Sequence, residues 1–466
     1  MKMITTESLT HFDLKRHYKL LLILIKMRKN VLILLLLGFI ATGLRVNAQE
    51  QPASLSLSVD EAVNYALENN KSISSARYDL LASQKGVWEA LAAGLPSIDA
   101  SASLNDNLII MTRLVTMNGQ TMAFKFGTQY ELAYGVTASS VLFNAPWIVG
   151  VQTAKLASVL ASQGLKQTEI DTKENVMTVY YLILSSKETL KVIDANLSNL
   201  NEILVSTKAM YSVGMAESTD VDQMQSTVSM LSNTKASMER SLEVSYNMLR
   251  FLLGVGRGTE INLTDNLDNI ILKINVDALM AEDFNIEDNV SYQMVENQVK
   301  MSELSLKGAK ASTLPTIAGS IYWQRSGMGD QLNPIGFYPF SAVGFQMQIP
   351  IFGSGLRYSK IQKAKINLDK ALNTKDMVSD QLLMQEKQLR FNLMSAFEQY
   401  KMQKENVEIA NRVLKSFQNK YNQGMASSLD LTQANNNYLT AQNNYLSALM
   451  NLLQTKVAFD KLMNNL

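Results

Sequence analysis

The sequence contains no cysteine, and its only histidines are His11 and His17. From residue 18 onward it therefore lacks the residues for a cysteine nucleophile, a serine–histidine pair or a common zinc site. A lipid-modified cysteine at a leader cleavage site is excluded as well. We expect no enzymatic activity, no cofactor and no metal centre.

Charged residues are also few, at 18% of the chain, and residues 49–466 have a net charge of −5 from 35 basic and 40 acidic side chains. That balance argues against nucleic acid as a partner. Proline, which breaks helices, is rare too, with only seven residues, at positions 52, 96, 146, 315, 334, 339 and 350. The long proline-free tracts between them favour long helices.

The N-terminal region has the pattern of a secretory signal peptide. A basic segment, an apolar segment and a small-residue cleavage site follow one another at Met27–Lys29, Val31–Leu44 and Val46–Ala48. The apolar run of 14 residues is shorter than the roughly 20 that a membrane-spanning helix needs. We predict an upstream extension and a signal peptide over residues 1–48, with an uncleaved anchor as the alternative.

The rest of the chain reads as two copies of one unit, 49–265 and 266–466. "YSVGMAESTD" from Tyr211 returns as "YNQGMASSLD" from Tyr421 with six identical residues, and two other stretches recur in the same order. Each copy is expected to contain a helix, two strands, a long helix, a tip turn and a returning helix. In repeat 1 we predict strands near 97–108 and 129–143, a long helix over 146–213, a turn at 214–219 and a returning helix over 220–254. In repeat 2 we predict a helix over 288–312, strands near 316–325 and 340–352, a long helix over 354–422, a turn at 423–428 and a returning helix over 429–463.

The predicted strands alternate strictly between apolar and polar residues. In the first of them, Ile98 and Leu104 are on one side, and Asp99 and Asn105 are on the other. Such alternation is typical of transmembrane β-barrels, although an ordinary amphipathic sheet shows it as well. Four strands cannot close a barrel, and lipid does not tolerate open sheet edges. If this is a barrel, several chains must share it, and three chains would supply twelve strands.

The long helices keep apolar residues at coiled-coil spacing, which indicates packing between neighbouring helices. Each tract of about 67 residues would be roughly 100 Å long. Their remaining faces are rich in Asn, Gln, Ser and Thr, as in "QANNNYLTAQNN" from Gln433. These polar faces fit either a solvated outer surface or a water-filled interior.

Together these features resemble the outer membrane efflux protein family, whose members are called TolC-like. The most specific elements are the strand entries Leu95-Pro96 and Leu314-Pro315 and the two Tyr-x-x-Gly-x-x-x-x-x-Asp turns. The resemblance implies an α+β membrane protein that forms a trimer in the outer membrane of a Gram-negative bacterium. A twelve-stranded transmembrane barrel, with four strands from each chain, would continue into a periplasmic coiled-coil barrel of helices.

The same resemblance implies a function and a set of partners. The trimer would be a passive channel for drugs and toxic compounds in a tripartite efflux or type I secretion system. It would contact outer membrane lipid, a periplasmic adaptor protein and an inner-membrane pump of the RND, ABC or MFS type. Two alternatives stay open: an outer membrane component for copper or silver export, and a secreted coiled-coil protein without a pore.

The resemblance also places the two turns at the periplasmic tip, where adaptor docking and channel closure are expected. Gly214 and Gly424 suit left-handed helix ends, and Ser218 or Thr219 and Ser427 or Ser428 suit the N-caps of the returning helices. The expected residues of the periplasmic gate are Asp430, Asp220, Tyr421 and Gln433. The expected residues of the turns and of adaptor docking are Gly214, Gly424, Met215, Met425, Ser218 and Ser428.

Individual tip residues carry specific expectations. Asp430 matches the family's constriction aspartate, while Gln433 and Ala426 replace a second aspartate and an arginine of that pattern. Tyr421 matches a tyrosine that hydrogen-bonds across the closed tip, with Asp220 as the candidate partner; a plain role in helix packing is the alternative. Helix capping is the alternative role for both aspartates. The alternative of copper or silver export rests on the 25 methionines of the chain, among which Met215 and Met425 recur at equivalent turn positions, because thioethers suit Cu(I).

Overall fold

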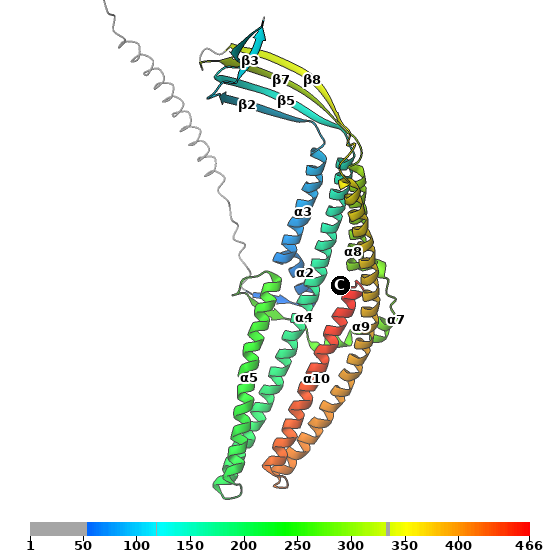
Figure 1. Ribbon diagram of the computed structural model, residues 1–466. Coiled ribbons are helices and arrows are strands. Elements are labelled where there is room, and N and C mark those ends of the chain that lie inside the picture. Colours follow the sequence, from blue (N-terminus) through cyan, green and yellow to red (C-terminus); the bar gives the residue numbers. More distant parts are fainter. Residues whose placement is uncertain (1–53, 118, 332–335) are drawn as a thin grey trace, which may run out of the picture. The chain divides into compact units, whose positions relative to one another are not determined.

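The computed structural model describes residues 54–117, 119–331 and 336–466, so the predicted leader over 1–48 lies outside the described residues. Long helices lead from a β-sheet at one end to two helical turns at the other (Figure 1). Among the helices described, none combines the length and the apolar character needed to cross a bilayer.

Four antiparallel strands form the main sheet, in the order β2-β5-β7-β8. Their bounds are Ser97–Asp106 for β2, Tyr130–Asn144 for β5, Thr316–Gly329 for β7 and Gly336–Gln348 for β8. The two repeats therefore join in the middle of the sheet through β5 and β7, whose pairing contains one irregularity between Val141 and Phe143. Among the described strands, β2 and β8 each have only one neighbour.

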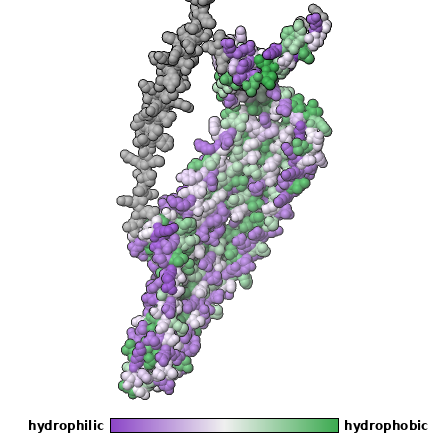
Figure 2. Space-filling view, turned by 60° about the vertical axis from the view of Figure 1, so that its left-hand side comes forward, coloured by the Kyte–Doolittle hydropathy of each residue, from purple (hydrophilic) through white to green (hydrophobic). Residues whose placement is uncertain are grey.

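The register of these strands sorts the side chains onto two faces. One row across the sheet consists of Ile98, Ala138, Ile321 and Val343. The adjacent row, on the opposite face, consists of Ser97, Ser139, Ser320 and Gly344. The apolar row is largely exposed in the single chain, with Ile98 at 76% and Val343 at 64%. Figure 2 likewise shows hydrophobic surface toward the sheet end and a more hydrophilic surface over the helices.

The strands differ from the sequence-based expectation in several respects. The strand β7 continues to Gly329 rather than 325, and β8 begins at Gly336 rather than 340. The last strand ends at Gln348 rather than near 352, because Pro350 has no N–H to continue a ladder. A second hairpin, β3 (Thr112–Met117) with β4 (Gln120–Lys125), was not predicted at all. The dipeptide Asn118-Gly119 in the sequence is a strong hairpin signal and would have revealed it.

The long helices form two hairpins of the same design. Hairpin 1 consists of α4 (Ala145–Ser212) and α5 (Ser218–Leu253), and hairpin 2 of α9 (Leu356–Asn422) and α10 (Ser428–Leu462). The long helices α4 and α9 extend up to the sheet, whereas α5 and α10 are about half as long. In the part nearest the turns the helices lie in the order α5, α4, α10, α9, so that α5 and α9 are the outer helices (Figure 1).

Shorter elements fill the space between the returning helices and the sheet. The helices α2 (Val59–Asn69), α3 (Lys71–Ala92) and α8 (Val290–Ala311) pack beside α4 and α9. The strands β1 (Ser54–Leu57) and β6 (Glu260–Leu263) form a parallel pair. The segment between the repeats contains α6 (Leu267–Leu272), α7 (Val276–Ala281) and the 3-10 turn η1 (Ile286–Asp288).

Two buried asparagines tie these short helices to the ends of the returning helices. Asn70 caps α3 by accepting from the N–H of Ser72 and Ile73, and its side-chain amide donates to the carbonyl of Leu252 at 2.7 Å. Asn289 caps α8 in the same way and donates to the carbonyl of Leu462 at 3.2 Å. One residue thus satisfies both a helix start and a helix end in each repeat.

We expect Asn70→Ala to lower the free energy of unfolding by about 2 kcal/mol. Roughly half comes from the lost N-cap and the rest from the lost hydrogen bond to Leu252. The neighbouring Asn69→Ala is the matched control, because the Asn69 amide donates only within its own helix, to the Tyr65 carbonyl. Denaturant unfolding of the purified protein measures both; equal effects would contradict the role assigned to Asn70.

Candidate functional site

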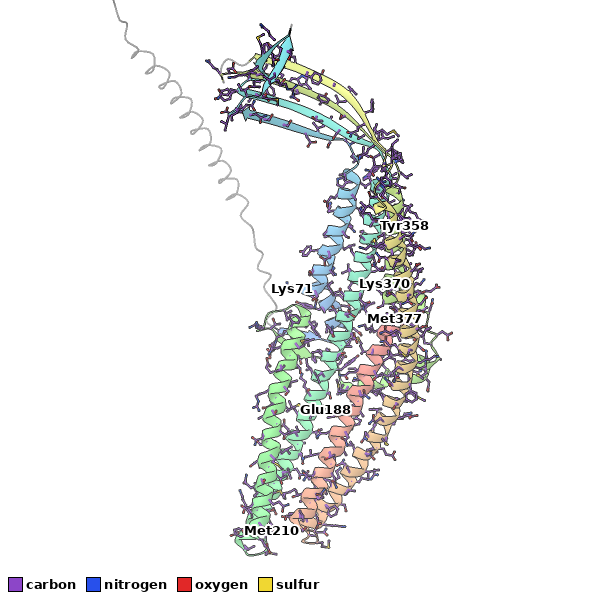
Figure 3. The ribbon with its side chains drawn as sticks, in the orientation of Figure 1. Lys71, Glu188, Met210, Tyr358, Lys370 and Met377 are labelled. Carbon is purple, nitrogen blue, oxygen red and sulfur yellow. The ribbon has the colours of Figure 1, made fainter. Side chains whose placement is uncertain are left out.

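The two turns at the end of the hairpins have the same backbone geometry. Gly214 has φ +73° and Gly424 has φ +70°, which is the left-handed region that glycine adopts without a steric penalty. The following residues close each helix: the N–H of Met215 donates to Met210 and that of Met425 to Lys420, both at 2.8 Å. This is the hydrogen-bond pattern of a Schellman ending. Met210 marks the α4–α5 turn in Figure 3.

The returning helices begin with one carboxylate each in the same position. The Asp430 carboxylate accepts from the backbone N–H of Ser427 at 3.1 Å, and the Asp220 carboxylate accepts from that of Glu217, also at 3.1 Å. In turn 2 the hydroxyl of Ser427 accepts a hydrogen bond from the N–H of Asp430, so Ser427, one of the two predicted caps, is the N-cap. In turn 1 the N-cap is Glu217, so the prediction of Ser218 or Thr219 was wrong. Glu217 is the N-cap because its backbone N–H donates to the carboxylate of Asp220, three residues later, as in a capping box.

The capping hydrogen bonds fix the charge of Asp430. Donation from the Ser427 hydroxyl and then from its backbone N–H lowers the pKa of this exposed carboxyl below its ordinary value. A carboxyl whose folded pKa is lowered stabilises the fold above its unfolded pKa, and this contribution is lost as the pH falls through the folded value. Within one chain Asp430 is therefore a charged capping residue at neutral pH.

The second oxygen of Asp220 joins the two hairpins. The hydroxyl of Ser428, at the start of α10, donates to Asp220 Oδ1 at the start of α5. Ser428 is buried and Asp220 is half-buried at this contact. Asp220 was expected to pair with Tyr421, and it pairs with Ser428 instead.

Tyr421 makes the other contact between the hairpins. Its hydroxyl lies 2.7 Å from the hydroxyl of Thr207 on α4. Because Thr207 donates its own proton to the Ile203 carbonyl, Tyr421 is the donor. Tyr421 is buried in an apolar cluster near the turns together with Leu200, Met224, Leu414 and Leu431, among others. Tyr421 therefore takes part in the helix packing and also makes a hydrogen bond between the hairpins of one chain, to Thr207 and not to Asp220.

The remaining predicted residues lie on the surface of the turns. Met215 and Met425 are 79% and 66% exposed. Gln433 is exposed and donates to Asn437 on its own helix. Within the described residues no group of three or more acidic or histidine side chains could hold a metal ion.

Sequence reasoning missed a set of buried amides and hydroxyls just above the turns. The side chains of Asn196 and Asn435 are 5% and 1% exposed, and neither amide has a hydrogen-bond partner within the described part of the chain. The hydroxyl of Thr432 is in the same situation.

We expect Tyr421→Phe to loosen the contact between the hairpins, because it removes one buried hydrogen bond worth about 1 kcal/mol. Local opening near Thr207 and Tyr421 should then become roughly fivefold more frequent, measured as faster hydrogen exchange. Tyr211→Phe is the control, since Tyr211 occupies the equivalent position of turn 1, is 51% exposed and has no hydrogen bond to its hydroxyl from the residues that the structure describes. If the two variants exchange alike, the Tyr421–Thr207 bond does not hold the hairpins together.

Comparison with known proteins accounts for this arrangement. The sequence profile of the outer membrane efflux protein family matches residues 62–255 and 287–465. The probable efflux pump outer membrane protein TtgC of Pseudomonas putida is 24% identical over 426 residues, covering 87% of this chain and 82% of TtgC. The outer membrane protein VceC of Vibrio cholerae has the same fold, with a TM-score of 0.70 at 16% identity over 87% of this chain and 95% of VceC. The open MtrE outer membrane channel of Neisseria gonorrhoeae gives a TM-score of 0.69 at 15% identity over 87% and 88% of the chains. Since the family profile covers most of the sequence, the chain belongs to the outer membrane efflux protein family.

Proposed function

We propose that three copies of this chain form one outer membrane channel whose twelve-stranded barrel is shared between them. The observation that carries the proposal is the open four-stranded sheet, in which β2 and β8 have free edges among the described residues. A bilayer offers no hydrogen bonds to such edges, so β8 of one copy must pair with β2 of the next. The exposed apolar row containing Ile98 and Val343 would face lipid, and the serine row would face the interior.

The outer helices support the same assembly. In the half nearest the turns, each carries exposed apolar residues at coiled-coil spacing, although neither has a partner helix on that side among the described residues. They are Met230, Val244, Met248 and Phe251 on α5, and Phe391, Met394, Met402, Ile409 and Val413 on α9. Because the two stripes lie on opposite edges of the chain, α5 of one copy would pack against α9 of the next. Such head-to-tail contacts close into a ring.

The proposed ring is a passive conduit for small molecules, drugs and toxic compounds among them. Two relatives from Pseudomonas putida are named as antibiotic and toluene efflux pump outer membrane proteins. A groove of about 610 Å³ between α4, α5 and α10 is lined by hydroxyl-bearing residues such as Ser185, Thr189 and Ser241 and by apolar residues such as Leu231 and Met450. A lining without charged side chains suits a passage that does not select one solute. The partners would be a periplasmic adaptor, docking at the turns, and an inner-membrane pump.

The same assembly would bring three copies of Asp430 to the narrow end of the passage. Asp430 is exposed and carries a charge at neutral pH. Carboxylates around a constriction attract cations and disfavour anions. Their mutual repulsion in the ring would oppose the lowering of the pKa that Ser427 produces in one chain.

We expect a disulfide to form between copies in the double variant Phe251→Cys, Phe391→Cys. The two positions are nearly level along the helices, because each lies roughly thirty residues from its turn. The chain has no cysteine of its own, so any oxidised product reports on these two sites alone. Denaturing gels without reductant should show covalent dimers and trimers for the double variant, and single chains for either variant alone or after reduction. Single chains from an oxidised double variant would contradict the proposed packing of α5 against α9.

We expect Asp430→Asn to weaken cation selectivity and block by divalent cations in planar bilayers. The amide has the size of the carboxylate and keeps an oxygen for the cap, but it removes the charge. Asp220→Asn is the matched control at the equivalent position of turn 1, where Ser428 already occupies one carboxylate oxygen. A larger loss of selectivity in Asp220→Asn than in Asp430→Asn would show that the gate belongs to repeat 1 and would contradict the role proposed for Asp430.

A further inference from the structure

The two turns are equivalent in sequence but are used differently within one chain. A shift of 210 residues relates Tyr211 to Tyr421, Ser218 to Ser428 and Asp220 to Asp430. Within one chain, Asp220 and Thr207 of hairpin 1 form hydrogen bonds with Ser428 and Tyr421 of hairpin 2, respectively. Each hairpin therefore has a used face, and a free face built from the equivalents of the residues that its neighbour uses.

The free faces contain unpaired counterparts of the Ser428–Asp220 contact. Asp220 and Asp430 each use one carboxylate oxygen to cap the start of their own helix. In both, Oδ2 accepts from the backbone N–H three residues earlier at 3.1 Å. The remaining Oδ1 of Asp220 accepts from Ser428, whereas that of Asp430 has no partner among the described residues. The hydroxyl of Ser218, the equivalent of Ser428, is exposed and also lacks a partner there. One donor and one acceptor of matching geometry are thus left over in every chain.

We infer that Ser218 of one copy donates a hydrogen bond to Oδ1 of Asp430 in the next copy, and so repeats the Ser428–Asp220 contact between chains. The inference rests on the proposed head-to-tail ring. In that ring hairpins 1 and 2 alternate around the axis, so the free face of hairpin 2 meets the free face of hairpin 1 of the next copy. The occupant of this face is therefore a second copy of the same chain.

The second contact between the hairpins is not repeated in the same form. The residue equivalent to Thr207 is Phe417, which cannot accept a hydrogen bond from a tyrosine. Tyr211 of the neighbouring copy would pack on Phe417 through ring contacts alone, where Tyr421 has a hydroxyl partner within the chain. The three junctions between copies would each hold one hydrogen bond fewer than the three junctions within chains. The tip should therefore open first between copies.

Cysteine pairs in this cysteine-free chain test the inference directly. We expect oxidised Ser218→Cys, Asp430→Cys to yield covalent dimers and trimers on denaturing gels. The matched pair Asp220→Cys, Ser428→Cys joins residues of one chain, so its product should run as a single chain. Because Asp430→Cys removes a cap, the pair Tyr211→Cys, Phe417→Cys, which leaves both caps intact, provides a second route to the same product.

The outcomes separate the inference from the proposed function. Cross-linked species from either free-face pair support the inference. If neither pair links copies while Phe251→Cys, Phe391→Cys does, the ring stands and the inference is overturned. If none of the three pairs links copies, the head-to-tail ring itself fails and the inference falls with it. A cross-link within one chain for Ser218→Cys, Asp430→Cys would also overturn it.

In planar bilayers we further expect Ser218→Ala to raise the open probability of the channel severalfold, and Ser218→Thr to restore it, because threonine keeps the hydroxyl. An open probability unchanged by Ser218→Ala would contradict a hydrogen bond at this junction.

Discussion

Backbone hydrogen bonding at the two sheet edges is the constraint on which the rest of the structure depends. In the part of the chain that the structure describes, β2 and β8 each have one edge without a neighbouring strand, and water can satisfy the N–H and C=O groups of that edge whereas lipid cannot. The apolar row across the sheet adds to the constraint, since side chains such as Ile98 need apolar surroundings. A single chain in a membrane is therefore an incomplete unit, and its edges dictate how copies must join.

The duplicated unit meets this constraint at both ends of the molecule. At the sheet, repeats 1 and 2 join through β5 and β7 in the same antiparallel manner that would join β8 to β2 of another copy. At the turns, the Ser428–Asp220 contact within one chain leaves its counterpart, Ser218 and Asp430, free for another copy. Between them, Asn70 and Asn289 attach each returning helix to the short helix of its own repeat. Equivalent residues of the two repeats thus form a contact within the chain in one case, and are left for a contact with another copy in the other case.

Much of this architecture could be predicted from the sequence, and the family assignment made on the Leu-Pro strand entries and the two turns is confirmed. The long helices could be predicted because heptad spacing and isolated breakers such as Gly424 are local signals. The pairing of Asp220 with Ser428 could not, because periodicity shows which residues share a helix face and not which neighbour that face meets. The cap at Glu217 was missed because glutamate is not among the preferred N-cap residues, whereas the serine one residue later is. The buried Asn196 and Asn435 looked like ordinary surface polar residues in an Asn-rich helix.

The mass of the native assembly tests the central claim most directly. Native mass spectrometry of the protein extracted from outer membranes and released from detergent reports the number of chains without any substitution. The account predicts three copies in one species, with circular dichroism of the same sample showing both helix and sheet. A folded, stable single chain with the same sheet content would contradict it, because the edges of β2 and β8 would then need no second copy.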